Sequence, residues 1–150
     1  MSARTPSLED LARAAEFLNS SAPLAHAGIR LSFPTTDLVA AEIPEVRPEH
    51  RGGLGTSAVN GGVLAAVFDL VTGCTALLVE VGRRSATVQL SMSFERPVLG
   101  DSLRAEARID SQGQRTLFVS AQIVDAHGQA CARCQAVVAL ARSGAKPLAP

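Results

Sequence analysis

The sequence lacks tryptophan and tyrosine and carries little charge of either sign. Of its 150 residues only 19% are charged, and 14 Lys and Arg balance 14 Asp and Glu, so the formal net charge is +0. A general nucleic-acid-binding protein needs excess positive charge and aromatic rings for base stacking, so we expect no nucleic-acid partner. The composition does not fit a disordered chain either, because hydrophobic residues make up 47% of it and can bury a core.

Signals for export and for membrane insertion are also missing. Glu9 and Asp10 stand where a secretory signal would need its apolar core, so we expect none. The longest apolar stretch, residues 63–81, carries Asp69 near its middle. Because a carboxylate is costly inside a bilayer, this stretch favours a buried helix over a membrane span. Three cysteines are an odd number in such a chain, and we expect reduced thiols in the cytoplasm.

The pattern of apolar residues predicts a single domain over residues 1–150, with a helix and tail at 1–20 and a C-terminal tail at 142–150. Helical spacing of apolar residues predicts a short helix over residues 8–19, ended by Pro23. Alternation of apolar and polar residues, bounded by turns, indicates strands. These strands are predicted over residues 29–33, 38–43, 86–94, 103–110, 115–125 and 129–141.

A long helix is predicted between the second and third strands, from about residue 60 to residue 81. It is apolar nearly all round, so it must be covered, and the sheet is the only large apolar face available. The last four strands follow one another and predict an antiparallel meander, with Thr87 on the polar side of its strand. The expected fold class is therefore α+β, a curved antiparallel β-sheet wrapped around a long central α-helix.

Asp69 is the residue of this helix that most needs an explanation. A buried carboxylate costs several kcal/mol unless it is paired, hydrogen-bonded or protonated. The residues at helical spacing from it are small, namely Gly62, Ala65, Ala66, Gly73 and Ala76. Such a strip leaves room for another backbone or for a ligand. Asp69 is therefore either a functional carboxylate or a structural one that pairs with an arginine across an interface.

Asn60, Gly61 and Gly62 stand at the start of the same helix. Unpaired amide N–H groups and the positive end of the helix dipole meet there, which favours a carbonyl oxygen or an oxyanion. Two turns of helix separate Gly61 from Asp69. A carbonyl polarised at the N-terminus and a carboxylate further along, from the same or a second subunit, suit acyl transfer to water.

These residues resemble a known family. The run Asn60-Gly-Gly-Val-Leu-Ala-Ala-Val-Phe-Asp69 resembles the helix signature of hotdog-fold acyl-CoA thioesterases of the phenylacetyl-CoA (PaaI-like) type, in which His-Gly-Gly precedes an acidic residue near the middle of the central helix. The resemblance covers about residues 15–141 and includes the strand at 86–94 and Pro97 after it. It implies the hotdog fold, in agreement with the architecture expected from periodicity.

The resemblance also implies an activity and its residues. The enzyme would hydrolyse an acyl or aryl-acyl thioester to a free acid and coenzyme A, with no metal or redox cofactor and with coenzyme A as part of the substrate. The Gly61 N–H would polarise the thioester carbonyl beside Asn60 and Gly62. Asp69 would be the nucleophile or the general base, and Thr87 would help to hold the water. Such enzymes are homodimers or dimers of dimers with active sites between subunits.

Three departures from the family pattern keep alternatives open. Asn60 replaces the motif histidine, Gly52 stands where many relatives have an asparagine, and the interval between them is longer, with an insertion at Ser57-Ala58. Either Asn60 supplies the orienting amide, or the site is slow or altered, or the protein is a non-catalytic acyl-CoA-binding hotdog protein. A hotdog hydratase or dehydratase ranks last, because it needs a histidine on the central helix, which has none.

His50, Arg83 and Arg84 are the remaining candidates for substrate contacts. His50 precedes the helix and either touches the ligand or forms a loop ion pair. Arg83 and Arg84 follow the helix and either hold the phosphates of coenzyme A or complement the helix dipole. Cys131 and Cys134 have redox-like spacing. Residues three apart in a strand point to opposite faces, so we expect neither a redox pair nor a zinc site.

Overall fold

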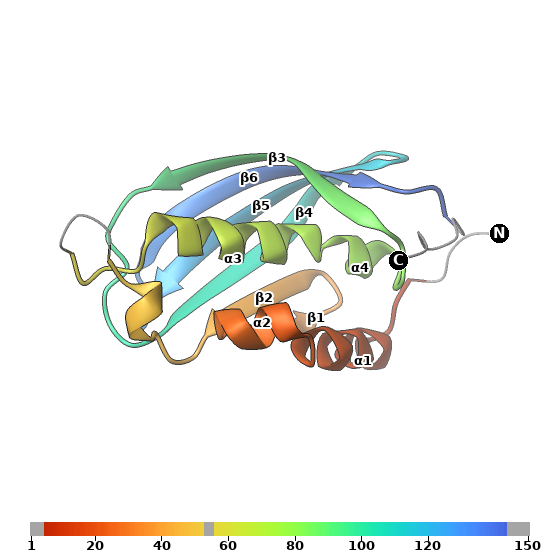
Figure 1. Cartoon of the computed structure of the whole chain (residues 1–150). Helices are drawn as coiled ribbons and strands as arrows, with labels where there is room; N and C mark the ends of the chain where they lie inside the picture. Colours follow the sequence, from red (N-terminus) through yellow and green to blue (C-terminus); the bar gives the residue numbers. More distant parts are fainter. Residues whose placement is uncertain (1–4, 53–55, 144–150) are drawn as a thin grey trace.

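A six-stranded antiparallel sheet with a helix packed on one face makes up most of the computed structural model, which describes residues 5–52 and 56–143 (Figure 1). The strands are β1 (Arg30–Thr35), β2 (Leu38–Ile43), β3 (Ser85–Phe94), β4 (Leu103–Gln112), β5 (Thr116–Asp125) and β6 (Ala130–Leu140). All six lie where alternation predicts strands. The C-terminal tail predicted at 142–150 lies mostly outside the described residues.

The order of the strands departs from the predicted meander. Across the sheet it is β1-β2-β4-β5-β6-β3, so β4, β5 and β6 form a meander but β3 pairs with β6 at the far edge. The alternation of apolar and polar residues shows which face of a strand is buried, but it does not show which strand lies beside it in the sheet. The chain therefore returns from one edge of the sheet to its middle between β3 and β4 (Figure 1).

Two helices precede the sheet. The first, α1 (Leu8–Asn19), begins with a capping box in which the Ser7 hydroxyl accepts from the Asp10 amide and the Asp10 carboxylate accepts from the Ser7 amide. The second is α2 (Ala22–Ala27), and Pro23 lies in its first turn. Proline is tolerated there because it lacks only an N–H that the first turn leaves unbonded. Pro23 therefore does not end α1, which stops at Asn19, as the sequence predicts.

The predicted long helix is α3 (Gly61–Gly73) followed after two residues by α4 (Ala76–Val79). Its length and hydropathy alone would also suit a membrane span, but one face packs on the concave side of the sheet (Figure 1). The buried side chains of α3 are Leu64, Val67, Phe68, Val71 and Thr72. They meet inward-facing residues such as Ile43, Leu117 and Ile123, and this layer is the hydrophobic core.

The opposite face of α3 is open, which corrects the expectation of a helix covered all round. Gly62, Ala66 and Asp69 are exposed, whereas Ala76 is buried. Asp69 is therefore not the buried carboxylate that the apolar run predicts. The sheet curves around one side of the helix only, and the strip of small residues lies on the side that it leaves uncovered.

Candidate functional site

Asp69 lies on a cavity of about 1130 Å³ between α1, the α3–α4 segment and the first residues of β3. Its walls are mostly apolar, with Phe17 and Leu18 from α1 and Leu70 and Leu77 from the central segment. It brings together Gly73 of the helix strip with Asp69 and Thr87, two residues predicted for catalysis. A largely apolar cavity with a few polar groups is the usual form of a small-molecule site.

Thr87 faces this cavity because of a bulge in β3. Thr87 pairs with Val138 and Gln89 pairs with Val137, so Val88 is one extra residue on the β3 side. The expectation that Thr87 lies on the polar side of its strand is therefore wrong. Its hydroxyl points toward the helix, and a Cβ added at Gly73 would stand 3.4 Å from Thr87 Oγ1. A methyl group at position 73 would thus come into contact with this hydroxyl.

The carboxylate of Asp69 has no hydrogen-bond or ion-pair partner among residues 5–52 and 56–143. It can therefore accept a proton or a hydrogen bond from a water molecule or a ligand. Its charge also acts on the neighbouring thiol of Cys74, whose pKa is raised to about 12, first by burial and second by Asp69. A thiol with this pKa stays protonated near neutral pH, so Cys74 is not a nucleophile.

The start of α3 presents one free amide. The Asn60 side-chain oxygen accepts from the Gly62 N–H at 2.7 Å, and the Asn60 carbonyl accepts from the N–H groups of Val63 and Leu64. Among the described residues this leaves the Gly61 N–H without a partner. The Asn60 side-chain nitrogen donates to the Gly52 carbonyl at 3.1 Å. Asn60 thus fixes the helix start against the preceding loop, and both ends of its amide are used.

One chain does not bring these groups to one reacting atom. Gly61 and Asp69 are eight residues apart in α3, which corresponds to about 12 Å along the helix axis. A thioester carbon must lie within about 3 Å of both the oxyanion donor and the attacking oxygen. The Gly61 N–H is therefore too far from Asp69 of the same chain for both to act on one thioester carbon.

His50 and Arg83 are held by the protein itself. The buried His50 ring accepts the Arg47 N–H at Nδ1, 2.9 Å away, so Nε2 carries the proton and donates to the Ala27 carbonyl at 2.7 Å. Arg83 donates through Nε to the Ala141 carbonyl at 2.8 Å. Neither ring nitrogen of His50 remains for a ligand, which corrects that alternative. Arg84 is exposed, and its guanidinium has no partner in the described part of the chain.

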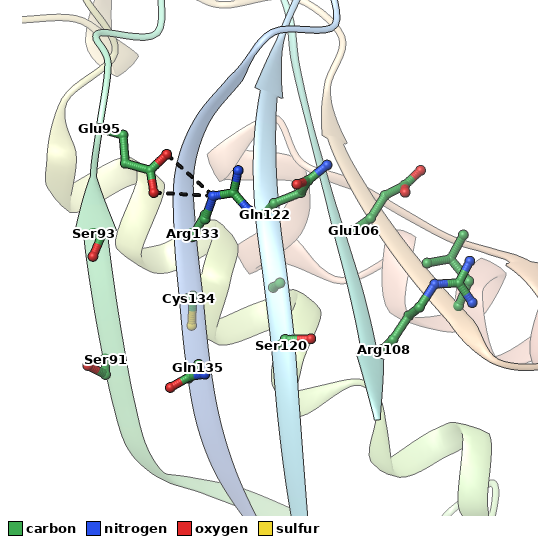
Figure 2. A pocket seen from close by; sticks show the side chains of 12 residues that line it. Ser91, Ser93, Glu95, Glu106, Arg108, Ser120, Gln122, Arg133, Cys134 and Gln135 are labelled. Atoms are coloured by element: carbon green, nitrogen blue, oxygen red, sulfur yellow. Dashed lines mark hydrogen bonds and ion pairs between the residues drawn. The ribbon is translucent and has the colours of Figure 1, made fainter. Parts of the chain in front are cut away.

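A second hollow with polar residues lies away from this cavity. This smaller hollow, of about 500 Å³, lies on the outer face of the sheet. Figure 2 shows polar side chains there, such as Gln122 and Gln135 and the Arg133–Glu95 ion pair, with the helix behind the strands. Its Arg108 is paired with Asp37 as well. Serines and Cys134 line this hollow, but no histidine that could act as their base is among its described lining residues.

The two cysteines of the last strand are both buried, which corrects the expectation that they point to opposite faces. A register shift between β5 and β6 places Cys131 and Cys134 on the core side. Both are free thiols, and burial raises the pKa of Cys134 to about 11. Within residues 5–52 and 56–143 no group of three or more potential ligands could hold a metal ion.

Comparisons with known proteins identify a family and similar folds. A family model described as the thioesterase superfamily matches residues 57–132. The fold is similar to a thioesterase from Haemophilus influenzae, at 21% identity over 92% of each chain with a TM-score of 0.76. It is also similar to the E. coli PaaI protein from the phenylacetic acid degradation operon, at 20% identity over 90% of this chain and 96% of that one, with a TM-score of 0.76.

A third similar structure contains a ligand. It is a Bacillus halodurans protein with CoA, 20% identical over 87% of this chain and 89% of that one, with a TM-score of 0.73. None of the curated proteins matches the sequence. The identities are too low to carry residue roles across, so the structural comparisons bear on the fold alone.

Proposed function

The chain belongs to the thioesterase superfamily, and from this premise we propose that it hydrolyses an acyl-CoA thioester to a free acid and coenzyme A. The observation that carries the proposal is that one apolar cavity is lined by both the Asp69 carboxylate, which has no partner in the described part of the chain, and the Thr87 hydroxyl. An apolar cavity suits an acyl group, and the carboxylate and hydroxyl suit a water molecule.

In the proposed reaction Asp69 acts as general base. A water molecule held by Asp69 and Thr87 gives its proton to the carboxylate, and its oxygen attacks the thioester carbon. The carbonyl oxygen becomes an oxyanion and accepts the Gly61 N–H of a partner subunit. The tetrahedral intermediate then expels the thiolate of coenzyme A, which takes the proton back from Asp69. Asn60 positions the helix start that carries the donor amide.

The partner is a second copy of this chain, bound along β3. This strand ends the sheet and has β6 on one side only, and Val88 and Phe94 on it are 62% and 54% exposed. A ten-residue edge strand invites pairing with another strand. The exposed strip of small residues on α3 would let a second helix approach closely. An antiparallel partner would bring its Gly61 toward Asp69.

Thiol release from a panel of acyl-CoA thioesters tests the activity. The panel holds aromatic, short, medium and long acyl groups, and the variants are Asp69→Asn and, as a control, Asp110→Asn. Asp110 is an exposed carboxylate that accepts from Ser120 on the sheet and does not border the cavity. We expect turnover by the wild type and the control and its loss in Asp69→Asn, with all three proteins folded.

Either of two results would contradict the proposal. Full turnover by Asp69→Asn would show that Asp69 is not the general base. No thiol release from any thioester, with acyl-CoA binding still measurable by calorimetry, would instead favour a binding protein. Sedimentation tests the assembly separately: Val88→Asp, which places a charge on the open edge, should lower the dimer population, and a monomeric wild type would exclude the shared site.

A further inference from the structure

The cavity beside Asp69 is much longer than the site of water attack requires. Leu70, Cys74 and Leu77 line it at successive turns of the α3–α4 segment, and Val81 lines it just after α4 ends. At 1.5 Å per residue, Leu77 lies about 12 Å beyond Asp69 along this segment. An aromatic acyl group such as benzoyl would occupy only the first part of this length, whereas an extended aliphatic chain would follow it.

The opposite wall is one face of α1. Arg13, Ala14, Phe17 and Leu18 line the cavity at spacings of one, three and four residues, so they form a single helical stripe. Phe17 is 77% exposed, although it is one of only five phenylalanines in the chain. The Phe17 ring therefore lies at the edge of the cavity, where an apolar ligand could contact it.

This wall is fixed to the sheet. The Asn19 side chain donates to the Leu31 carbonyl and accepts the Leu31 N–H, both at 2.8 Å, so the end of α1 is joined to β1 as a neighbouring strand would be. Leu11 on the other face of α1 is fully buried. The position of Phe17 over the cavity is therefore set by the fold.

Polar groups line the far end of the cavity. Glu80 accepts hydrogen bonds from the Ser143 hydroxyl at 2.9 and 3.0 Å and lies 3.9 Å from Arg83. Both Glu80 and Arg83 line the cavity. An alkyl chain longer than the apolar walls would meet groups that are already paired, and displacing them would leave charges unpaired. The polar end thus sets an upper limit on chain length.

We propose that the substrate carries a straight, aliphatic acyl chain of medium length, and that the α1 wall with Phe17 and the side chains of Cys74 and Leu77 select that length. The inference rests on the proposed hydrolysis at Asp69. The thioester group stands at Asp69 and Thr87, and the chain extends along the helix past Cys74 and then Leu77. Each of these two positions therefore measures a different length of chain.

Graded filling of the cavity tests this assignment. The variants are Cys74→Leu and Leu77→Phe, whose positions lie about 7.5 and 12 Å beyond Asp69 along the helix. In Cys74→Leu we expect kcat/KM to fall at least about tenfold for octanoyl- and decanoyl-CoA while butyryl-CoA is changed less than about twofold. Leu77→Phe should spare octanoyl-CoA and affect decanoyl-CoA. Phe17→Ala should raise KM for decanoyl-CoA alone. Phe118→Ala, at a half-exposed ring on β5, is the matched control.

A second measurement separates this proposal from the proposed hydrolysis. Calorimetry with free butyric, octanoic and decanoic acids measures occupancy without turnover. If the wild type releases thiol but accepts aromatic and aliphatic groups alike, and both filling variants keep its profile, the chain-length assignment is wrong and the hydrolysis stands. If no thioester is cleaved but decanoic acid binds and Cys74→Leu abolishes that binding, the cavity assignment stands and the hydrolysis is wrong.

Discussion

Replacing Gly61 by proline removes one hydrogen-bond donor and leaves the fold intact. Gly61 is the first residue of α3, where proline is favoured and its fixed φ suits the helix. Asn60 before it has φ −61° and ψ 137°, the extended conformation that a residue before proline adopts. The Gly61 N–H has no partner among the described residues, so the substitution breaks no hydrogen bond of the folded protein.

The structure gives opposite signs for the effects on stability and on activity. Proline at a compatible position raises the free energy of unfolding by about 0.4–1 kcal/mol, because the unfolded chain has fewer conformations to lose. Loss of an oxyanion donor costs about 3–4 kcal/mol in the transition state, which lowers kcat by about 100- to 1000-fold. Gly61→Ala is the control, since it keeps the N–H and its Cβ would meet only Phe94 ring atoms at 3.8 and 4.0 Å.

The assay combines urea unfolding with thiol release from the best substrate of the panel. A Gly61→Pro protein that is as stable as the wild type and equally active would refute the role of this amide. Mixing provides a further check. Gly61→Pro and Asp69→Asn are each inactive in the shared-site arrangement, but randomly exchanged subunits should recover about a quarter of the wild-type activity. A site within one chain would recover none.

Three further predictions concern neighbouring groups. Burial, and then Asp69, raises the pKa of Cys74 to about 12 from its ordinary 9.0. Between these two pH values only the unfolded chain loses the thiol proton. The contribution of Cys74 to the free energy of unfolding, measured with urea, should therefore be complete below pH 9.0 and decline as the pH rises toward about 12. In Asp69→Asn the pKa of Cys74 should fall, and mass spectrometry should detect faster alkylation at high pH. His50→Ala leaves the half-buried Arg47 N–H and Ala27 carbonyl without this partner, so thermal and urea unfolding should register a loss of about 1–3 kcal/mol. Arg84→Ala should raise KM for acyl-CoA about two- to fivefold at low salt and less at high salt, whereas Arg83→Ala should lower stability because Arg83 joins the end of β6.

Local sequence patterns predict the elements of this fold well. The capping residues Ser7 and Asp10 and the spacing of Leu11 and Ala15 lie within one stretch of chain, so α1 begins and ends where predicted. The same holds for β4, β5 and β6, whose turns join neighbours. The position of β3 beside β6 depends on contacts between distant segments, and alternation contains no information about it.

The candidate site shows the same division. Asp69 and Gly61 can be selected from the sequence because one is a charge in an apolar run and the other is a glycine at a helix start. The exposure of Asp69 in one chain cannot be predicted from the sequence, because an apolar helix face can be covered either by the same chain or by a second one. The use of both nitrogens of His50 also depends on a distant segment, the carbonyl of Ala27.

The bulge at Val88 has a consequence for insertions and deletions. Without Val88, the strand would alternate regularly from Ser85 to Phe94, and Thr87 would still face the helix. Chains of this family that differ by one residue at this point would thus share the same wall around the carboxylate. An alignment that permits no gap inside the strand would compare Thr87 with the wrong residue, and would report a missing hydroxyl where only the count of residues has changed.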